Sequence, residues 1–161
     1  MSRHRVAERA SRAVYFTIVA LAIIVALEEA GEDVSATEVV ASTVGATIIT
    51  ALADLYARYI AEAIRQEGFS SEEFRAAAID TAAGVLAAIV PVVPFVVAAA
   101  GGAISEQSAY DVAAWLGLGV LAAYTLFANR AAGLTGLRGL VTAAAVLLLG
   151  FALIALKALV H

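Results

Sequence analysis

The sequence predicts an all-α integral membrane protein with five transmembrane helices, and its composition and apolar runs lead to that class. Of its 161 residues, 63% are hydrophobic and only 15% are charged, and the mean hydropathy is +0.93. Soluble domains carry about 45–50% apolar and about 25% charged residues, and a chain this short has too little interior to hide the excess. The apolar runs are continuous, whereas barrel strands alternate. We therefore expect a single membrane domain over residues 1–161, in the lipid bilayer of a prokaryotic plasma membrane.

Five apolar stretches approach the length of about 20 residues that a spanning helix needs. The predicted spans lie at about 13–29, 38–64, 78–104, 110–129 and 138–160. A polar turn at 65–75 separates the second span from the third. Within this turn, Ser70 or Ser71 is expected to cap the next helix, because Glu72 and Glu73 would then occupy its first turn, where the helix dipole favours negative charge.

The basic residues predict the orientation of the spans. Nine of the ten lysines and arginines lie before the first span or around the second and fourth connections, and only Lys157 falls on the other side. The third connection contains Glu106 and Asp111 and no basic residue. The positive-inside rule therefore places the N-terminus in the cytoplasm. Because five is an odd number, the C-terminus is expected outside.

Several classes of function are excluded by what the chain lacks. It has no cysteine, and its two histidines, His4 and His161, lie at the chain ends. Disulfides, thiolate metal sites and Ser-His-Asp catalysis are therefore not expected. No pair of nucleophile and base can be assembled, so the chain is not expected to be an enzyme, and its composition does not fit a nucleic-acid partner. Any buried chemistry must come from carboxylates, hydroxyls, backbone carbonyls and arginines.

The second span contains the most informative polar residues. Asp54, Arg58 and Glu62 follow one another at intervals of four, which places them on one stripe of a helix. Ionisable residues at bilayer depth are functional candidates by default, because an unpaired charge there is costly. Arg58, Tyr56 and Tyr59 are the candidate ion-path or charge-partner residues. The alternative is an internal ladder of charges that only continues the helix into the cytosol.

Asp80 stands just before the uncharged part of the third span and is expected near the same membrane face. It could supply a second carboxylate opposite Asp54, and we predict Asp54, Glu62 and Asp80 as metal ligands, since carboxylates suit hard divalent cations. An interfacial residue at a helix start is the alternative for Asp80. Further along, Pro91 and Pro94 predict a helix kink that frees backbone carbonyls.

Taken in order, spans two to five resemble the vacuolar iron transporter family, whose members move ferrous iron or manganese. The resemblance lies in the run Ala-Asp-Leu-Tyr-Ala-Arg at 53–58, the Pro-x-x-Pro-Phe step at 91–95, and the arginine-containing turn at 133–139. It implies a five-span fold with a cytoplasmic N-terminus and a homodimer. It also implies Fe²⁺ or Mn²⁺ as the transported ion, with Asp54 at the matched ligand position and no firm cofactor.

The sequence departs from the family at three places. Arg12-Ala13 stands where the family has an Asp-Gly pair, and Arg58 stands where it has a methionine. The turn at 65–75 replaces the cytoplasmic metal-binding domain of eukaryotic members. The predicted function is transport of a divalent metal cation. The alternative is a non-transporting scaffold or partner-binding subunit, and Arg58 separates the two, because its neutralisation by Asp54 and Glu62 would seal the path.

Overall fold

The computed structural model describes residues 3–30, 34–65, 70–101 and 103–133, together with residues 137, 139, 141, 143–146, 148 and 152. The regular elements assigned within this part of the chain are helical, which confirms the all-α prediction. They are α1 (Arg3–Glu29), α2 (Ala36–Arg65), α3 (Ser71–Ile89), the short 3-10 helix η1 (Val90–Val92), α4 (Val93–Ala99) and α5 (Glu106–Ala132).

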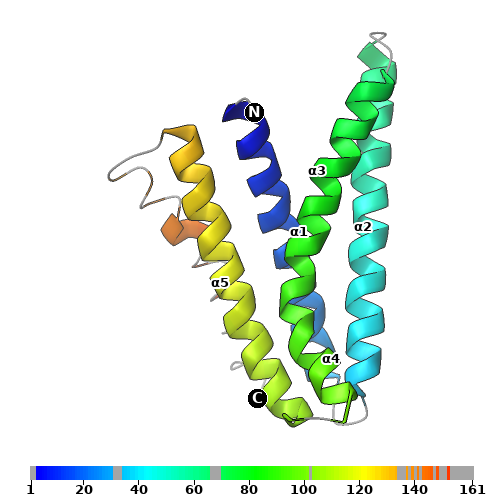
Figure 1. Cartoon of the computed structure of the whole chain (residues 1–161), viewed down its shortest axis with the longest axis vertical. Helices are drawn as coiled ribbons and strands as arrows, with labels where there is room; N and C mark the ends of the chain where they lie inside the picture. The colour runs from blue at the N-terminus through cyan, green and yellow to red at the C-terminus, as the bar shows by residue number, and fades with distance from the viewer. Residues whose placement is uncertain are drawn as a thin grey trace.

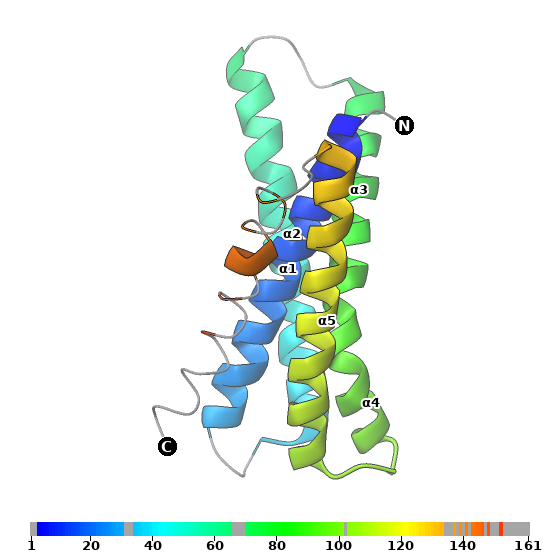
Figure 2. The ribbon, with the colours of Figure 1, turned by 90° about the vertical axis from the view of Figure 1, so that its left-hand side faces the viewer.

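The long helices form an up-and-down bundle in which α1 lies between α3 and α5 (Figure 1). α1 starts at the same end of the bundle as the turn from α2 to α3, and we call this the arginine end. The opposite end, where α1 finishes and α2 and α5 begin, is the acidic end. The end of α2 and the start of α3 reach beyond the start of α1 at the arginine end (Figure 2).

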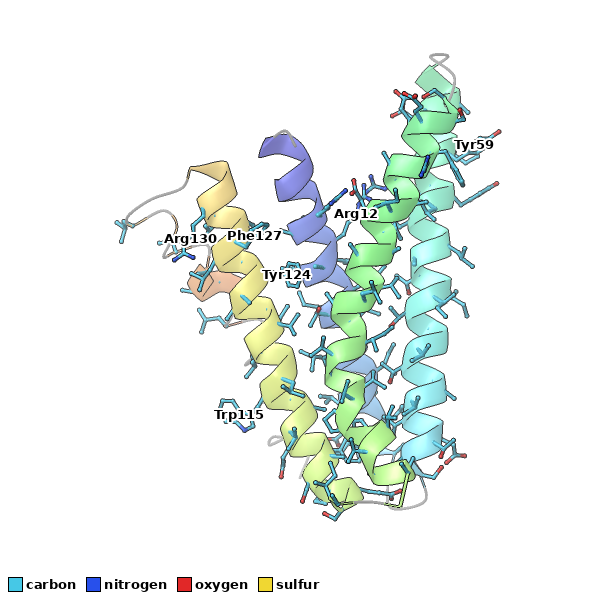
Figure 3. The ribbon with its side chains drawn as sticks, in the orientation of Figure 1. Arg12, Tyr59, Trp115, Tyr124, Phe127 and Arg130 are labelled. Carbon is cyan, nitrogen blue, oxygen red and sulfur yellow. The ribbon has the colours of Figure 1, made fainter. Side chains whose placement is uncertain are left out.

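Four of the helical segments in the described part of the chain are long and apolar enough to cross a membrane. They are Arg9–Glu29, Ala36–Ile64, Ser71–Ala99 and Glu106–Arg130, and they contain most of the first four predicted spans. Large apolar side chains such as Ile49, Leu86 and Trp115 are exposed, and Trp115 points away from the other helices (Figure 3). These features are consistent with an integral membrane protein. Of the fifth predicted span, 138–160, the structure describes only residues 139, 141, 143–146, 148 and 152.

Local side-chain contacts set where the helices begin and end. The Ser70 hydroxyl accepts a hydrogen bond from the backbone N–H of Glu73, and the Glu73 carboxylate accepts from the backbone N–H of Ser70. This capping box starts α3 where the sequence predicted. Ser35 and Glu38 form the same arrangement at the start of α2. α5 ends at Gly133, whose φ of 70° favours glycine.

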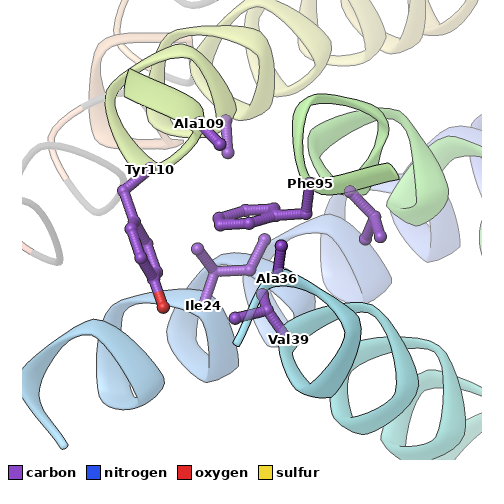
Figure 4. Packing of buried hydrophobic residues seen from close by; sticks show 8 residues of the cluster. Ile24, Ala36, Val39, Phe95, Ala109 and Tyr110 are labelled. Carbon is purple, nitrogen blue, oxygen red and sulfur yellow. The ribbon is translucent and has the colours of Figure 1, made fainter. Parts of the chain in front are cut away.

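Two hydrophobic clusters fill the bundle between its ends. The cluster nearer the acidic end joins α1, α2, α4 and α5, and it includes Ile24, Val39, Phe95 and Tyr110 (Figure 4). Phe95 and Tyr110 meet edge to face with ring centroids 4.7 Å apart. The second cluster lies one or more turns further toward the arginine end and joins Phe16 and Ala20 of α1 to Ala51 of α2 and Ala88 of α3.

Glycines let α1 pack closely against both of its main neighbours. A Cβ atom on Gly84 of α3 would lie 2.6 Å from Phe16 Cδ2, and one on Gly117 of α5 would overlap the side chain of Leu21. Small residues at helix contacts allow this close approach, on which membrane helix association depends. Gly84 therefore fixes the spacing of α1 and α3 beside the polar residues described next.

Candidate functional site

A layer of charged side chains lies at the arginine end, next to the second hydrophobic cluster. We call it the charged layer and define it as Arg9 and Arg12 of α1, Asp54 and Arg58 of α2, and Asp80 of α3. Each helix places its members by regular rise. Asp54 lies 18 residues after Ala36, a rise of about 27 Å, and Arg12 lies 17 residues before Glu29, a rise of about 26 Å.

Asp80 is held by an arginine of another helix. Its carboxylate accepts a hydrogen bond from Arg9 Nε, which joins α3 to α1 across the bundle. The Asp80 side chain is only 6% exposed, whereas that of Arg9 is 35% exposed. A buried carboxylate needs a charged partner or several donors to stay ionised. The pairing with Arg9 therefore gives Asp80 a structural role between two helices.

Arg12 strengthens the same contact between α1 and α3. Its guanidinium donates to the Ala77 carbonyl at 3.2 Å and to Thr81 Oγ1 at 3.4 Å, and the residue is buried. Figure 3 shows Arg12 reaching from α1 toward α3. Thr81 lies about one helical turn before Gly84 in α3, and Ala77 lies about two turns before it. The Arg12 hydrogen bonds and the close contact at Gly84 therefore hold the same two helices, α1 and α3, together. Arg12 stands where the resembled family has an acidic residue, and its charge here is used for helix packing.

Asp54 pairs within its own helix. Arg58 Nε donates to Asp54 Oδ2 at 3.0 Å, and the two side chains are 29% and 31% exposed. This is the i, i+4 geometry that the spacing predicted. Glu62, the third residue of the stripe, is partly buried, while Tyr56 and Tyr59 are exposed on other faces of α2. Tyr59 points away from the bundle in Figure 3.

The stripe that carries Asp54 continues the buried face of α2. Thr43, Thr47 and Ala51 are buried at intervals of four, and Asp54 and Arg58 follow at intervals of three and four. Thr47 Oγ1 donates to the Thr43 carbonyl at 2.7 Å. The Thr43 hydroxyl is buried and has no hydrogen-bond partner among the described residues. Polar groups therefore follow one face of α2 from the bundle centre to the charged layer.

The two prolines break the third predicted span. α3 ends at Ile89, and Pro91 lies in η1, while Pro94 lies in the first turn of α4. Both prolines are buried. The Val90 N–H bonds to the Ala87 carbonyl and the Val93 N–H bonds to the Val90 carbonyl, so part of the backbone satisfies itself by tighter turns. This break lies nearer the acidic end than the charged layer does.

Two of the three predicted metal ligands, Asp54 and Asp80, belong to separate ion pairs. Asp80 bonds to Arg9, Asp54 bonds to Arg58, and no three histidine, cysteine or acidic residues of the described segments are grouped as a metal would require. Metal binding by Asp54, Glu62 and Asp80 stays a prediction. Sequence reasoning used Arg9 for topology, used Arg12 for topology and as a departure from the resembled family, and predicted neither as a site residue. Helix rise could have indicated them, because Arg9 and Arg12 lie at about the same depth as Asp80 when residues are counted from the acidic end.

Comparison of the chain with family models, with curated proteins and with solved structures gives no match. The resemblance to the vacuolar iron transporter family therefore rests on the quoted residues, and membership of that family stays a prediction.

Proposed function

We propose that the chain is a non-transporting membrane scaffold or partner-binding subunit whose charged layer closes the cytoplasmic end of the bundle. One observation carries this proposal, namely that the two deepest carboxylates, Asp54 and Asp80, each bond to an arginine. A guanidinium occupies carboxylate lone pairs and cannot coordinate a cation, and its fixed charge repels one. The charged layer is thus suited to fastening helices together.

The proposal includes five spans with the N-terminus and the arginine end in the cytoplasm. The partition of nine basic residues against Lys157 supports this topology. Helix rise gives the depth of the charged layer, because Asp54 and Arg12 lie about 26–27 Å from the acidic end and a bilayer core is about 30 Å thick. The charged layer then lies at the inner headgroup boundary. Tyr56 and Tyr59 fall at the same level, where membrane helices favour aromatic residues.

Metal-dependent thermal stabilisation tests the scaffold proposal. The detergent-purified chain and the Asp54→Asn variant are melted with and without Mn²⁺ or Fe²⁺, the latter kept reduced. Asp54→Asn keeps the shape and removes the charge that a cation would need. We expect the two proteins to respond equally to each metal, because Asp54 is occupied by Arg58. Stabilisation of the wild type that Asp54→Asn abolishes would contradict the proposal.

Transport of a divalent cation of the iron or manganese class is the second candidate, and one observation favours it. The polar face of α2 runs from the buried Thr43 and Thr47 to Asp54, and polar groups facing the inside of a membrane bundle often mark an ion path. If Arg58 moves away from Asp54, a carboxylate is left at the end of that face. Arg58→Met would then create a binding site for Mn²⁺ that the wild type lacks.

For either function we propose a homodimer. Five helices enclose little of a central path, and membrane helices associate by close packing of their surfaces. α2 offers such a surface, since a Cβ atom added to Gly45 would meet no other atom within 4 Å. Native mass spectrometry in several mild detergents tests the proposal, and a monomeric mass in all of them would contradict it.

A further inference from the structure

Thr43 of α2 does not make the hydrogen bond that neighbouring threonines make. Thr47 and Thr50 of α2 each donate to the carbonyl four residues earlier, at 2.7 and 2.8 Å, and Thr17 of α1 does the same at 2.7 Å. The Thr43 residue is 0% exposed, and its hydroxyl has no partner among the described residues. A buried hydroxyl without a hydrogen bond is costly, so a partner is expected at this place.

The face of α2 that contains Thr43 packs against the break in the third predicted span. Val39, one turn before Thr43, belongs to the same buried cluster as Val92 and Phe95 (Figure 4). Ala51, two turns after Thr43, belongs to the cluster that contains Ala88 of α3. Contacts also join α2 to α3, η1 and α4. Thr43 therefore lies between residues that pack on either side of the break.

Helix rise places Thr43 and the break at the same depth. Thr43 follows Ala36, the first residue of α2, by a rise of about 10 Å. Between the break and the acidic end lies α4, Val93–Ala99, whose rise is also about 10 Å. Both distances are counted from the acidic end, where α2 begins and α4 ends (Figure 1). Since a bilayer core is about 30 Å thick, Thr43 and the break both lie within the hydrocarbon layer.

The break presents backbone groups that can bond to a small polar molecule. Pro91 and Pro94 have no N–H, and both are buried. The carbonyls of Ala87 and Val90 accept hydrogen bonds within the tighter turns, but a carbonyl oxygen has two lone pairs and can accept a second bond. Proline breaks in membrane helices are tolerated where tighter turns, Ser or Thr side chains and ordered waters satisfy the backbone. η1 is such a turn, and Thr43 is such a side chain.

We propose that an ordered water molecule binds between Thr43 and the break and joins α2 to the third span. The water accepts a hydrogen bond from the Thr43 hydroxyl and donates to backbone carbonyls of the break. Buried waters make about three hydrogen bonds each, so both sides are satisfied together. Water fits better than an ion, because the side chains of the two clusters are almost all apolar and give no charge compensation. The site uses no residue of the charged layer, so the proposal is independent of the scaffold function.

Radiolytic footprinting tests this site, because a short X-ray pulse splits bound water into hydroxyl radicals that oxidise the side chains beside it. The full-length chain in lipid nanodiscs is irradiated, and the oxidised positions are located by mass spectrometry. Val92 and Phe95 are 1% and 0% exposed, so radicals from bulk water do not account for oxidation there. We expect oxidation within residues 90–95 of the wild type. Thr43→Val, which keeps the shape and removes the hydroxyl, should lower it several-fold.

Thr47→Val is the matched control. Thr47 is only 2% exposed and lies one turn from Thr43, but its hydroxyl bonds within its own helix, so the variant should leave the oxidation unchanged. Absence of oxidation at 90–95 in the wild type, or equal oxidation in Thr43→Val, would overturn the proposal. If Thr43→Val does not fold, Thr43→Ala removes the same hydroxyl, and oxidation at the wild-type level in that variant would overturn it equally.

The direction of the stability change gives a second readout. When the hydroxyl holds a water, Thr43→Val loses those hydrogen bonds and should unfold in mixed micelles at a lower concentration of denaturing detergent than the wild type. A hydroxyl without any partner would instead make Thr43→Val the more stable protein, and that result would contradict the proposal. Oxidation of the buried Phe16 as strong as that of residues 90–95 would indicate a water-filled path along α2 and would overturn the single site.

Discussion

Breaking the ion pair between Arg9 and Asp80 should destabilise the bundle. The loss of stability should depend on which of the two residues is replaced. Arg9→Met leaves a carboxylate that is 94% buried without its cation, whereas Asp80→Asn leaves an arginine that is 35% exposed and still reaches polar surroundings. Removing one partner of a fully buried pair costs about 3–5 kcal/mol, and exposed pairs are worth about 0–1 kcal/mol. With one partner partly exposed, we expect a coupling energy of about 1–3 kcal/mol between these limits, and the larger single loss for Arg9→Met.

A double-mutant cycle measures this coupling. Unfolding of the wild type, both single variants and the double variant is followed in mixed micelles by helical circular dichroism as the denaturing detergent is increased. Arg75→Met is the control, because Arg75 is an exposed arginine of α3, and it should change stability by less than about 0.5 kcal/mol. A coupling energy below about 0.5 kcal/mol, or a loss in Arg75→Met equal to that in Arg9→Met, would refute a structural role for the pair.

Three further predictions concern packing and topology. Gly84→Ala places a Cβ atom 2.6 Å from Phe16 Cδ2 and should cost about 1–3 kcal/mol in unfolding free energy. Gly119→Ala meets no atom within 4 Å and should be neutral or stabilising by up to about 1 kcal/mol, so equal losses in the two variants would contradict the close approach. Single cysteines at positions 35 and 70, in a chain without native cysteine, should react with an impermeant thiol reagent from opposite sides of the membrane. Labelling of Ser35→Cys and Ser70→Cys from the same side would refute the topology.

Much of the fold followed from local sequence signals. The capping box of Ser70 and Glu73 depends on residues three apart, and the pairing of Asp54 with Arg58 depends on residues four apart, so one helix contains all the information. The apolar lengths predicted the four described spans for the same reason. The helices run further than the spans, as α1 shows by starting at Arg3, because polar turns continue a helix beyond the hydrocarbon core.

The contacts between helices could not be predicted in this way. Asp80 was expected to face Asp54, but it bonds to Arg9, because α3 packs on α1 where Gly84 admits Phe16. Which helices become neighbours depends on such small-residue contacts, and small residues are too frequent in this alanine-rich chain to single one out.

Uptake of Mn²⁺ into proteoliposomes tests the central claim most directly, namely that arginine-paired carboxylates make the charged layer a closure and not an ion path. Folded wild type, Asp54→Asn and Arg58→Met are reconstituted at equal density, and a divalent-cation ionophore shows that each preparation can be loaded. The scaffold function predicts uptake at the level of protein-free vesicles for all three proteins. Uptake by the wild type that Asp54→Asn abolishes would contradict it and establish cation transport through Asp54.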